Sequence, residues 1–216
     1  MSWRITPTQS IPAVIGESFG GGYFAGYISH TADGNPTHAL IVAPRLEGAT
    51  GTGYNLTTNP QWKTATTTTA NTTSNFNGAA NTAAMVTAGI ADHPAANFCV
   101  GLSIGGFSDW YLPARYELDI AYFNLKPGTT SNNTSWGSNI YSVPRRNINN
   151  TATYPAQTAL TAFNTSAEAF VAGNLWSSTE ESNNNAWFYS FADGFQNNFG
   201  KTASIIGVRA FRRIAL

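Results

Sequence analysis

The chain has 216 residues, and its 11 Lys and Arg balance its 11 Asp and Glu, so the formal net charge at pH 7 is zero. Charged side chains make up only 10% of the residues, which excludes both the broad basic surface that binds nucleic-acid phosphates and charge-driven disorder. Thr occurs 27 times and Asn 22 times, beside 13 Phe, 9 Tyr and 6 Trp. This composition predicts one domain, rich in strands and loops, with a neutral polar surface.

The first residues and the cysteine content narrow the class further. Residues 1–18 lack the basic start and apolar stretch of a secretory signal, and no apolar run approaches the roughly 18 residues of a membrane helix. Cys99 is the only cysteine, so the sequence is neither a disulfide scaffold nor a Cys-based zinc site. We expect Cys99 to be a buried small hydrophobe in a chain that matures in a reducing compartment or needs no oxidation.

The first part of the chain predicts two strands. Residues 22–28 are aromatic and Gly-spaced, and residues 39–43 form a short apolar run, with turn signals between the two. The three glycines at 20–22 precede a strand rather than a helix, which indicates close approach of two backbones rather than phosphate binding. Residues 45–78 are Thr-rich and poor in apolar side chains, so they form either a long surface loop or a polar-faced hairpin.

Helical patterns occupy the middle of the chain. Residues 81–90 tolerate a helix that Gly89 would end. Residues 113–125 predict the clearest helix, because Leu118, Ala121, Tyr122 and Leu125 form one apolar face. A short helix is also expected within 155–170.

The last forty residues return to strands. Residues 186–192 alternate, which places Trp187, Tyr189 and Phe191 inward and Phe188 and Ser190 outward. Asp193-Gly194 predicts a two-residue hairpin, with 195–199 as the return strand and 204–214 as the final strand.

Residues suited to catalysis are sparse. His30, His38 and His93 lack metal-ligand spacing, and no phosphate-binding glycine loop or nucleophile elbow is present. Asp109 and Glu117 could form a carboxylate pair of the glycosidase type. The sequence nevertheless predicts no enzyme, no metal site and no cofactor.

Aromatic and amide side chains gather near the C-terminus. Eight aromatic residues lie between positions 174 and 211, interleaved with Asn183, Asn184, Asn185, Asn197 and Asn198. Rings supply contact area at low entropy cost and amides supply adaptable hydrogen bonds, so exposed pairs of this kind form recognition surfaces for proteins or sugars. An ordinary sheet with polar turns is the alternative interpretation.

Two motifs carry a family resemblance. Residues 106–115 read GFSDWYLPAR and are followed by Glu117 and Leu118; residues 175–180 read LWSSTE and are followed by Trp187, Asp193-Gly194 and Arg209. Together they resemble the C-terminal domain of collagen-like bacterial adhesins. That family shares the C-type-lectin fold with phage tail-fibre tips and with the variable proteins of diversity-generating retroelements, of the major-tropism-determinant type. The resemblance covers residues 97–214.

The resemblance implies an α+β protein with a C-type-lectin-like fold: short antiparallel strands, two or three helices and long polar loops. Residues 1–216 would form a single domain, in which 1–96 supply N-terminal strands and the Thr-rich loop and 97–216 the lectin-like core. Trp110, Trp176 and Trp187 would anchor that core, and Arg209, Arg212 and Arg213 could pair with Glu180, Glu181 or Asp109. The calcium-binding triplets and cysteines of animal lectins are absent, which argues against calcium-dependent sugar binding. The paired cysteines of formylglycine-generating enzymes, which share the fold, are absent too.

The function implied is that of a non-catalytic receptor-binding protein at the tip of a virion tail, made in the host cytoplasm. Its partners would be a host-surface glycan or protein and other tail proteins, with no nucleic acid, and the chain would form a homotrimer. In the resembling proteins the variable residues lie between fixed positions of the second motif, and strand alternation narrows these to Asn183, Asn184, Asn185, Phe188, Ser190, Phe195, Asn197, Asn198 and Phe199. The alternatives are a structural tail or fibre-attachment component, a bacterial surface adhesin and a polysaccharide-degrading enzyme.

Overall fold

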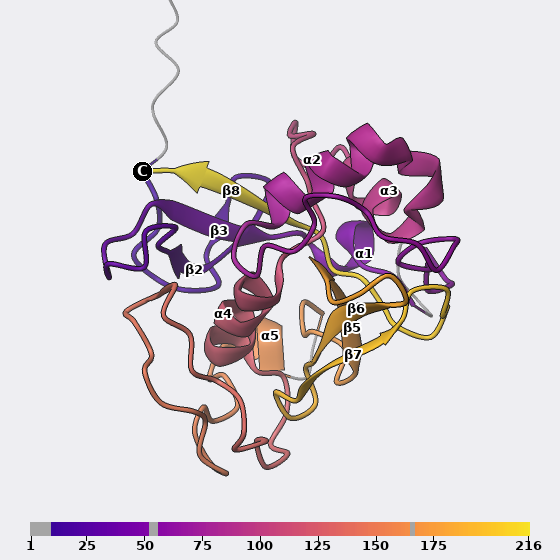
Figure 1. Ribbon diagram of the computed structural model, residues 1–216. Coiled ribbons are helices and arrows are strands. Elements are labelled where there is room, and N and C mark those ends of the chain that lie inside the picture. The colour runs from indigo at the N-terminus through magenta and orange to yellow at the C-terminus, as the bar shows by residue number, and fades with distance from the viewer. Residues whose placement is uncertain (1–9, 52–55, 165–166) are drawn as a thin grey trace, which may run out of the picture.

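The computed structural model describes residues 10–51, 56–164 and 167–216. It is a mixed α/β protein with antiparallel sheets and few helices, which agrees with the predicted α+β class. Figure 1 shows the two sheets on either side of a central helix, α4. The first sheet has the order β1-β2-β3-β8, with β4 paired to β2, and the second has the order β5-β6-β7.

The first sheet joins the two ends of the described chain. Its strands are β1 (Ser18–Phe19), β2 (Gly22–Ile28), β3 (His38–Val42), β4 (Ser142–Val143) and β8 (Phe211–Ala215). The strands predicted at 22–28 and 39–43 are confirmed as β2 and β3. A side chain at Gly22 would collide with the carbonyl oxygen of Val42, so the predicted close approach of backbones is found here between β2 and β3.

Three of the helices were predicted from the sequence, and the others were not. They are α1 (Arg45–Gly48), α2 (Gly78–Gly89), the 3-10 helix η1 (Ile90–Asp92), α3 (Pro94–Val100), α4 (Arg115–Leu125) and α5 (Thr161–Asn164). The helices predicted at 81–90, 113–125 and within 155–170 correspond to α2, α4 and α5. Neither α1, which lies in the range predicted as a loop or hairpin, nor α3 was predicted, although Pro94 at the start of α3 is a residue that favours the first turn. Cys99 on α3 is buried, as expected.

Helix α4 packs between the sheets because one of its faces is apolar and its start is capped. Leu118, Ala121, Tyr122 and Leu125 are all fully buried, and α4 contacts β2 of the first sheet and β5 and β6 of the second. The Glu117 carboxylate accepts a hydrogen bond of 2.7 Å from the Ala114 backbone N–H. That bond satisfies a donor that the first helical turn leaves free.

The second sheet consists of β5 (Asn174–Glu180), β6 (Asn185–Ser190) and β7 (Gln196–Gly200). The predicted two-residue hairpin is wrong, because the Ser190 N–H bonds the Phe195 carbonyl at 2.8 Å and four residues lie between them. The cause is Phe191, which is completely buried and stays in the core instead of joining the turn.

The final strand is shorter than the predicted range 204–214. Before β8 begins, Gly207 pairs with Leu175 of the second sheet and Arg209 pairs with Ala49, so this segment crosses from one sheet to the other. Arg212 pairs with Asp109 at 2.7 Å, as expected. Arg209 instead pairs with Glu168 at 3.0 Å.

The Thr-rich segment is neither a hairpin nor a purely exposed loop. Thr69 and Thr72 are buried because they bond the Glu180 carboxylate: the Thr69 N–H donates to it at 3.0 Å and the Thr72 hydroxyl at 2.8 Å. Glu180 also forms a buried ion pair with Lys201. The ammonium of buried Lys63 donates to the carbonyl oxygens of Thr67 and Thr68. Two buried cations and one carboxylate therefore fold the segment against the second sheet.

We expect Lys201→Met to lower the free energy of unfolding by about 3–5 kcal/mol, because the buried Glu180 carboxylate would lose its counter-ion. Urea unfolding followed by circular dichroism measures this. Glu181→Gln is the matched control: Glu181 is the exposed neighbour, and its substitution should change stability by less than about 0.5 kcal/mol. A Lys201→Met protein as stable as the wild type would contradict this account of the segment.

Candidate functional site

The hairpin formed by β6 and β7 exposes part of the predicted recognition surface. Asn183 and Asn184, in the loop before β6, and Asn197 on β7 are exposed. Phe199 keeps 44% of its surface accessible. Asn185 and Asn198 are half-buried, and the Asn185 amide donates to the Asn198 side-chain oxygen at 3.0 Å. These six residues, Asn183–Asn185 and Asn197–Phe199, form what we term the amide edge.

The prediction that Phe188 and Ser190 are exposed is wrong, since each side chain is only 7% accessible. Phe188 belongs to the same core cluster as Trp62, Trp176 and Ile206. The cluster draws on a distant loop, on β5 and on the crossing segment, so the face of β6 that was expected to meet solvent is turned toward the core. Phe195 is half-buried against the same cluster. The fully exposed positions of this region therefore lie in the loop before β6 and on β7, and not on β6 itself.

Trp187 was predicted to face the core but is partly accessible. Tyr189 and Phe191 are fully buried, as predicted, but Trp187 of the same parity is half-buried. The Arg115 guanidinium lies 3.8 Å from the centre of the Trp187 ring and 4.9 Å from that of Trp136. This cation–π arrangement is favourable by roughly 0.5–2 kcal/mol. Because Trp187 is the register partner of Asn198, a partly accessible indole adjoins the amide edge.

The amide edge also lies on the outer strand of its sheet. The order β5-β6-β7 places β7 last, and within the described ranges it pairs with β6 alone. Asn197 and Phe199 are thus presented on a strand whose inner side is fixed by β6. Rigid backbone and exposed side chains together suit binding, because little conformational entropy is lost when a ligand docks.

The carboxylates considered for catalysis do not form an accessible pair. Asp109 is exposed and bonds Arg212. Glu117 is completely buried, where its oxygens accept bonds from Ala114 N–H, Gly78 N–H and the Tyr111 hydroxyl. Burial raises the pKa of Glu117 to about 7. A substrate cannot reach this group in the described structure, so Glu117 acts as a scaffold residue.

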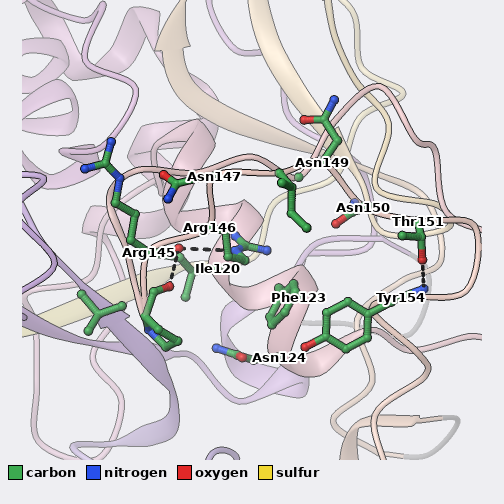
Figure 2. A pocket seen from close by; sticks show the side chains of 15 residues that line it. Ile120, Phe123, Asn124, Arg145, Arg146, Asn147, Asn149, Asn150, Thr151 and Tyr154 are labelled. Carbon is green, nitrogen blue, oxygen red and sulfur yellow. Dashed lines mark hydrogen bonds between the residues drawn. The ribbon is translucent and has the colours of Figure 1, made fainter.

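A pocket of about 310 Å³ is lined by α4 and by residues of the long segment between α4 and α5. Figure 2 shows the rings of Phe123 and Tyr154 side by side in it, and the two ring centres are 5.2 Å apart. Arg145, Arg146 and Asn150 also line the pocket. None of the predicted site residues lines this pocket. The sequence did not predict it, because residues 128–153 show no periodicity that would mark a binding site.

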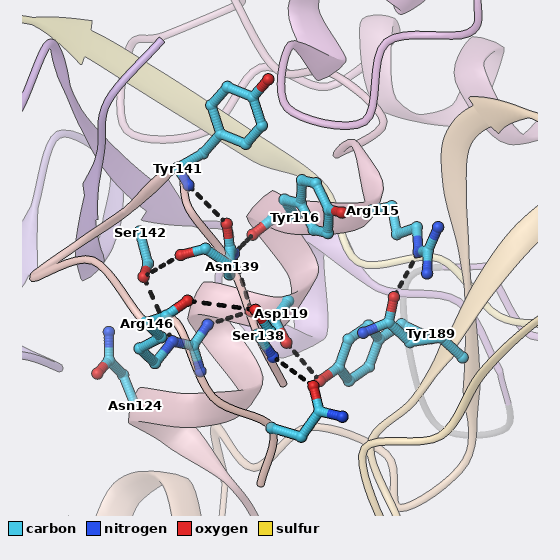
Figure 3. Close-up of polar contacts among 12 residues, drawn as sticks. Arg115, Tyr116, Asp119, Asn124, Ser138, Asn139, Tyr141, Ser142, Arg146 and Tyr189 are labelled. Atoms are coloured by element: carbon cyan, nitrogen blue, oxygen red, sulfur yellow. Dashed lines mark hydrogen bonds and ion pairs between the residues drawn. The ribbon is translucent and has the colours of Figure 1, made fainter. Parts of the chain in front are cut away.

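A buried polar network holds this loop against α4 (Figure 3). The Asp119 carboxylate of α4 pairs with Arg146 and accepts bonds from the Asn139 amide at 2.8 Å and the Tyr189 hydroxyl at 3.0 Å. Asp119 is 1% accessible, and burial raises its pKa. The network connects the pocket loop, α4 and β6, so the pocket wall has a fixed position.

Several general properties of the chain bear on its function. No helix in the described part of the chain is both long and apolar enough to cross a bilayer. Within the same residues, no group of three or more His, Cys, Asp or Glu could hold a metal ion. A comparison with protein-family models gives no match, and neither does one with curated proteins. The function must therefore be inferred from the chemistry of the surface.

Glu117 predicts a specific pH dependence of stability. Its pKa is raised from 4.5 to about 7 in the folded protein, so the folded state binds more protons than the unfolded state between these values. The contribution of Glu117 to stability is therefore largest below about pH 4.5 and is lost as the pH rises through 7. We expect wild type to lose about 3 kcal/mol across this range relative to Glu117→Gln, measured by urea unfolding at each pH. Parallel curves for the two proteins would contradict it.

Proposed function

We propose that the chain is a non-catalytic receptor-binding protein of a virion tail, and that the amide edge contacts a molecule on the host surface. The observation that carries this proposal is the presentation of exposed Asn183, Asn184, Asn197 and Phe199 on one hairpin. Phe199 keeps 44% of its surface accessible among these amides. It offers apolar contact area surrounded by groups that donate and accept hydrogen bonds.

The fold proposed for this function is C-type-lectin-like. The two motifs that carry the resemblance are in direct contact: the Ser178 N–H bonds the Pro113 carbonyl at 2.8 Å, and the Arg115 N–H bonds the Thr179 hydroxyl at 3.2 Å. Trp110 and Trp176, one from each motif, are buried in the same cluster. Motif residues that pack together in this way are expected if the motifs specify a fold, and this supports the assignment.

Trimerisation is part of the proposal. A tail tip that carries three copies would present three amide edges, and simultaneous binding converts weak single contacts into strong attachment. Sedimentation equilibrium of the purified protein, and of the protein released from particles, should give a trimer. A monomer in the assembled particle would contradict this part of the proposal.

The double substitution Asn197→Ala and Phe199→Ala tests the surface. We expect binding of labelled protein to host cells to fall at least tenfold, because the exposed ring and its neighbouring amide are lost, while the unfolding midpoint stays close to that of wild type. Val86→Ala on α2 is the matched control, since Val86 is an apolar side chain that is 47% exposed far from the hairpin in sequence. It should leave binding unchanged.

Unchanged binding by the double variant would exclude the amide edge as the receptor contact. Immunogold labelling of particles then separates the remaining structural role: a distal tip supports attachment to the host, whereas an internal joint supports a fibre-attachment component. Incubation with host polysaccharides should release no cleavage products; release would identify an enzyme instead.

A further inference from the structure

The Arg115 side chain, at the start of α4, is held in one position against the second sheet. Its guanidinium lies 3.8 Å from the centre of the Trp187 ring and 4.9 Å from that of Trp136, and both indoles are half-buried. Its Nε donates to the Gln196 side-chain oxygen at 2.5 Å. Because these contacts fix the planar guanidinium, little conformational entropy is lost when its other nitrogens bind a ligand.

Two nitrogens of this guanidinium have no partner. Within residues 10–51, 56–164 and 167–216, no acceptor bonds Arg115 Nη1 or Nη2, and neither atom is among the buried side-chain atoms that lack a partner there. Both nitrogens therefore reach solvent. They are neighbouring donors in one plane, which is the geometry that binds the two oxygens of a carboxylate.

The positive charge of Arg115 is not neutralised by an ion pair. No carboxylate among the described residues pairs with it, and Figure 3 shows its guanidinium apart from the carboxylate of Asp119. Asp119 attracts Arg115 only at longer range, and its oxygens are already bonded within the buried network. Burial lowers the pKa of the Arg115 guanidinium, which indicates incomplete solvation of the charge. A bound anion would therefore be attracted to this position.

Two amide side chains lie on the same side of the hairpin as the guanidinium. Trp187 pairs with Asn198 across the strands, so these two side chains project to one side, and Asn197 and Phe199 project to the other. The Asn185 amide donates to Asn198 Oδ1, which leaves the Asn198 nitrogen as a donor and the Asn185 oxygen as an acceptor. A hydroxyl group can use both, because it donates one hydrogen bond and accepts others.

We propose that this side of the hairpin binds one carboxylated sugar unit, with the carboxylate on Arg115 Nη1 and Nη2. The sugar hydroxyls bond the Asn185–Asn198 pair, and its C–H groups lie against the accessible part of the Trp136 indole. The inference rests on the proposed function, because Asn185 and Asn198 belong to the amide edge. It names the class of host-surface molecule as an acidic glycan.

The test is isothermal titration of the full-length protein with the methyl glycosides of glucuronic acid and N-acetylneuraminic acid. Methyl glucoside supplies the hydroxyls without the carboxylate, and acetate supplies the carboxylate without the ring. We expect at least one of the two acidic sugars to bind at least tenfold more tightly than either comparison compound. An affinity for the glucoside or acetate that equals that for the acidic sugars overturns the proposal, and so does the absence of saturable binding of both acids.

Variants locate the site. Arg115→Gln removes the cation and should weaken binding of the acidic sugar at least tenfold. Arg145→Gln is the matched control, since it removes an exposed arginine from the segment between α4 and α5, and it should bind the acid as wild type does. Asn198→Asp carries the test if Arg115→Gln does not fold: it keeps the acceptor for the Asn185 amide and adds a negative charge that should repel the acid at least tenfold. Undiminished binding of the acid by either folded variant overturns the assignment.

The two proposals can fail separately. The double substitution Asn197→Ala and Phe199→Ala changes the opposite side of the hairpin, so it should leave binding of the acid unchanged, whereas Arg115→Gln should reduce both binding of the acid and attachment to host cells. Binding of the acid, together with attachment that neither protein reduces, would contradict the proposed function alone. Attachment that depends on Asn197 and Phe199, without any binding of the acid, would contradict this inference alone.

Discussion

The buried Glu180 carboxylate organises the side of the molecule that has few apolar residues. It ends β5, and it gathers the Thr69 N–H, the Thr72 hydroxyl and the Lys201 ammonium around one site. Lys201 in turn donates to the Thr67 carbonyl at 3.0 Å and lies 4.9 Å from the centre of the Trp62 ring. An isolated buried charge would be very costly, so each of these groups makes the burial of the others tolerable. This coupling places Trp62 over the second sheet.

Trp62 belongs to the same large core cluster as Phe188 of β6. Trp62 is completely buried, and its indole N–H donates to the Ser177 carbonyl at 2.8 Å. Together with Ile206 it belongs to the cluster that buries Phe188. On β7, Asn197 and Phe199 remain exposed, whereas Phe188 on the neighbouring strand does not. The polar network adjoins the amide edge, because the Lys201 N–H donates to the Asn184 carbonyl at 2.9 Å.

Local sequence patterns predicted the helices and strands, but they did not predict which residues pack against each face. The apolar face of α4 follows from its 3.6-residue period, and β2 and β3 follow from short apolar runs, because these signals depend on neighbours in sequence. The alternation of side chains along β6 correctly placed Phe188 and Tyr189 on opposite faces of the strand. Alternation does not predict that both of these side chains are buried. Phe188 is buried in a cluster that includes residues 62 and 206, which are remote from it in sequence.

The polar segments were the least predictable. Threonines at 66–69 indicate a surface loop, and only their distant partners Glu180 and Lys201 explain why Thr69 is buried. The loop over the pocket has no period, so the sequence did not indicate that Phe123 and Tyr154 meet or that Asn150 lacks a partner. Both its parity and its place in the second motif assigned Trp187 to the core, and the Arg115 guanidinium that stacks on its half-buried ring lies 72 positions earlier in the chain.

The exposure of several amide-edge side chains has an evolutionary consequence. Substitutions at exposed positions usually change stability by no more than about 0.5 kcal/mol, and Asn183, Asn184 and Phe199 are such positions. Related chains could therefore diversify there while retaining the same architecture, because natural selection for a new target would act on residues that folding leaves almost unconstrained. Phe188 and Ser190, enclosed on the neighbouring strand, should drift far more slowly.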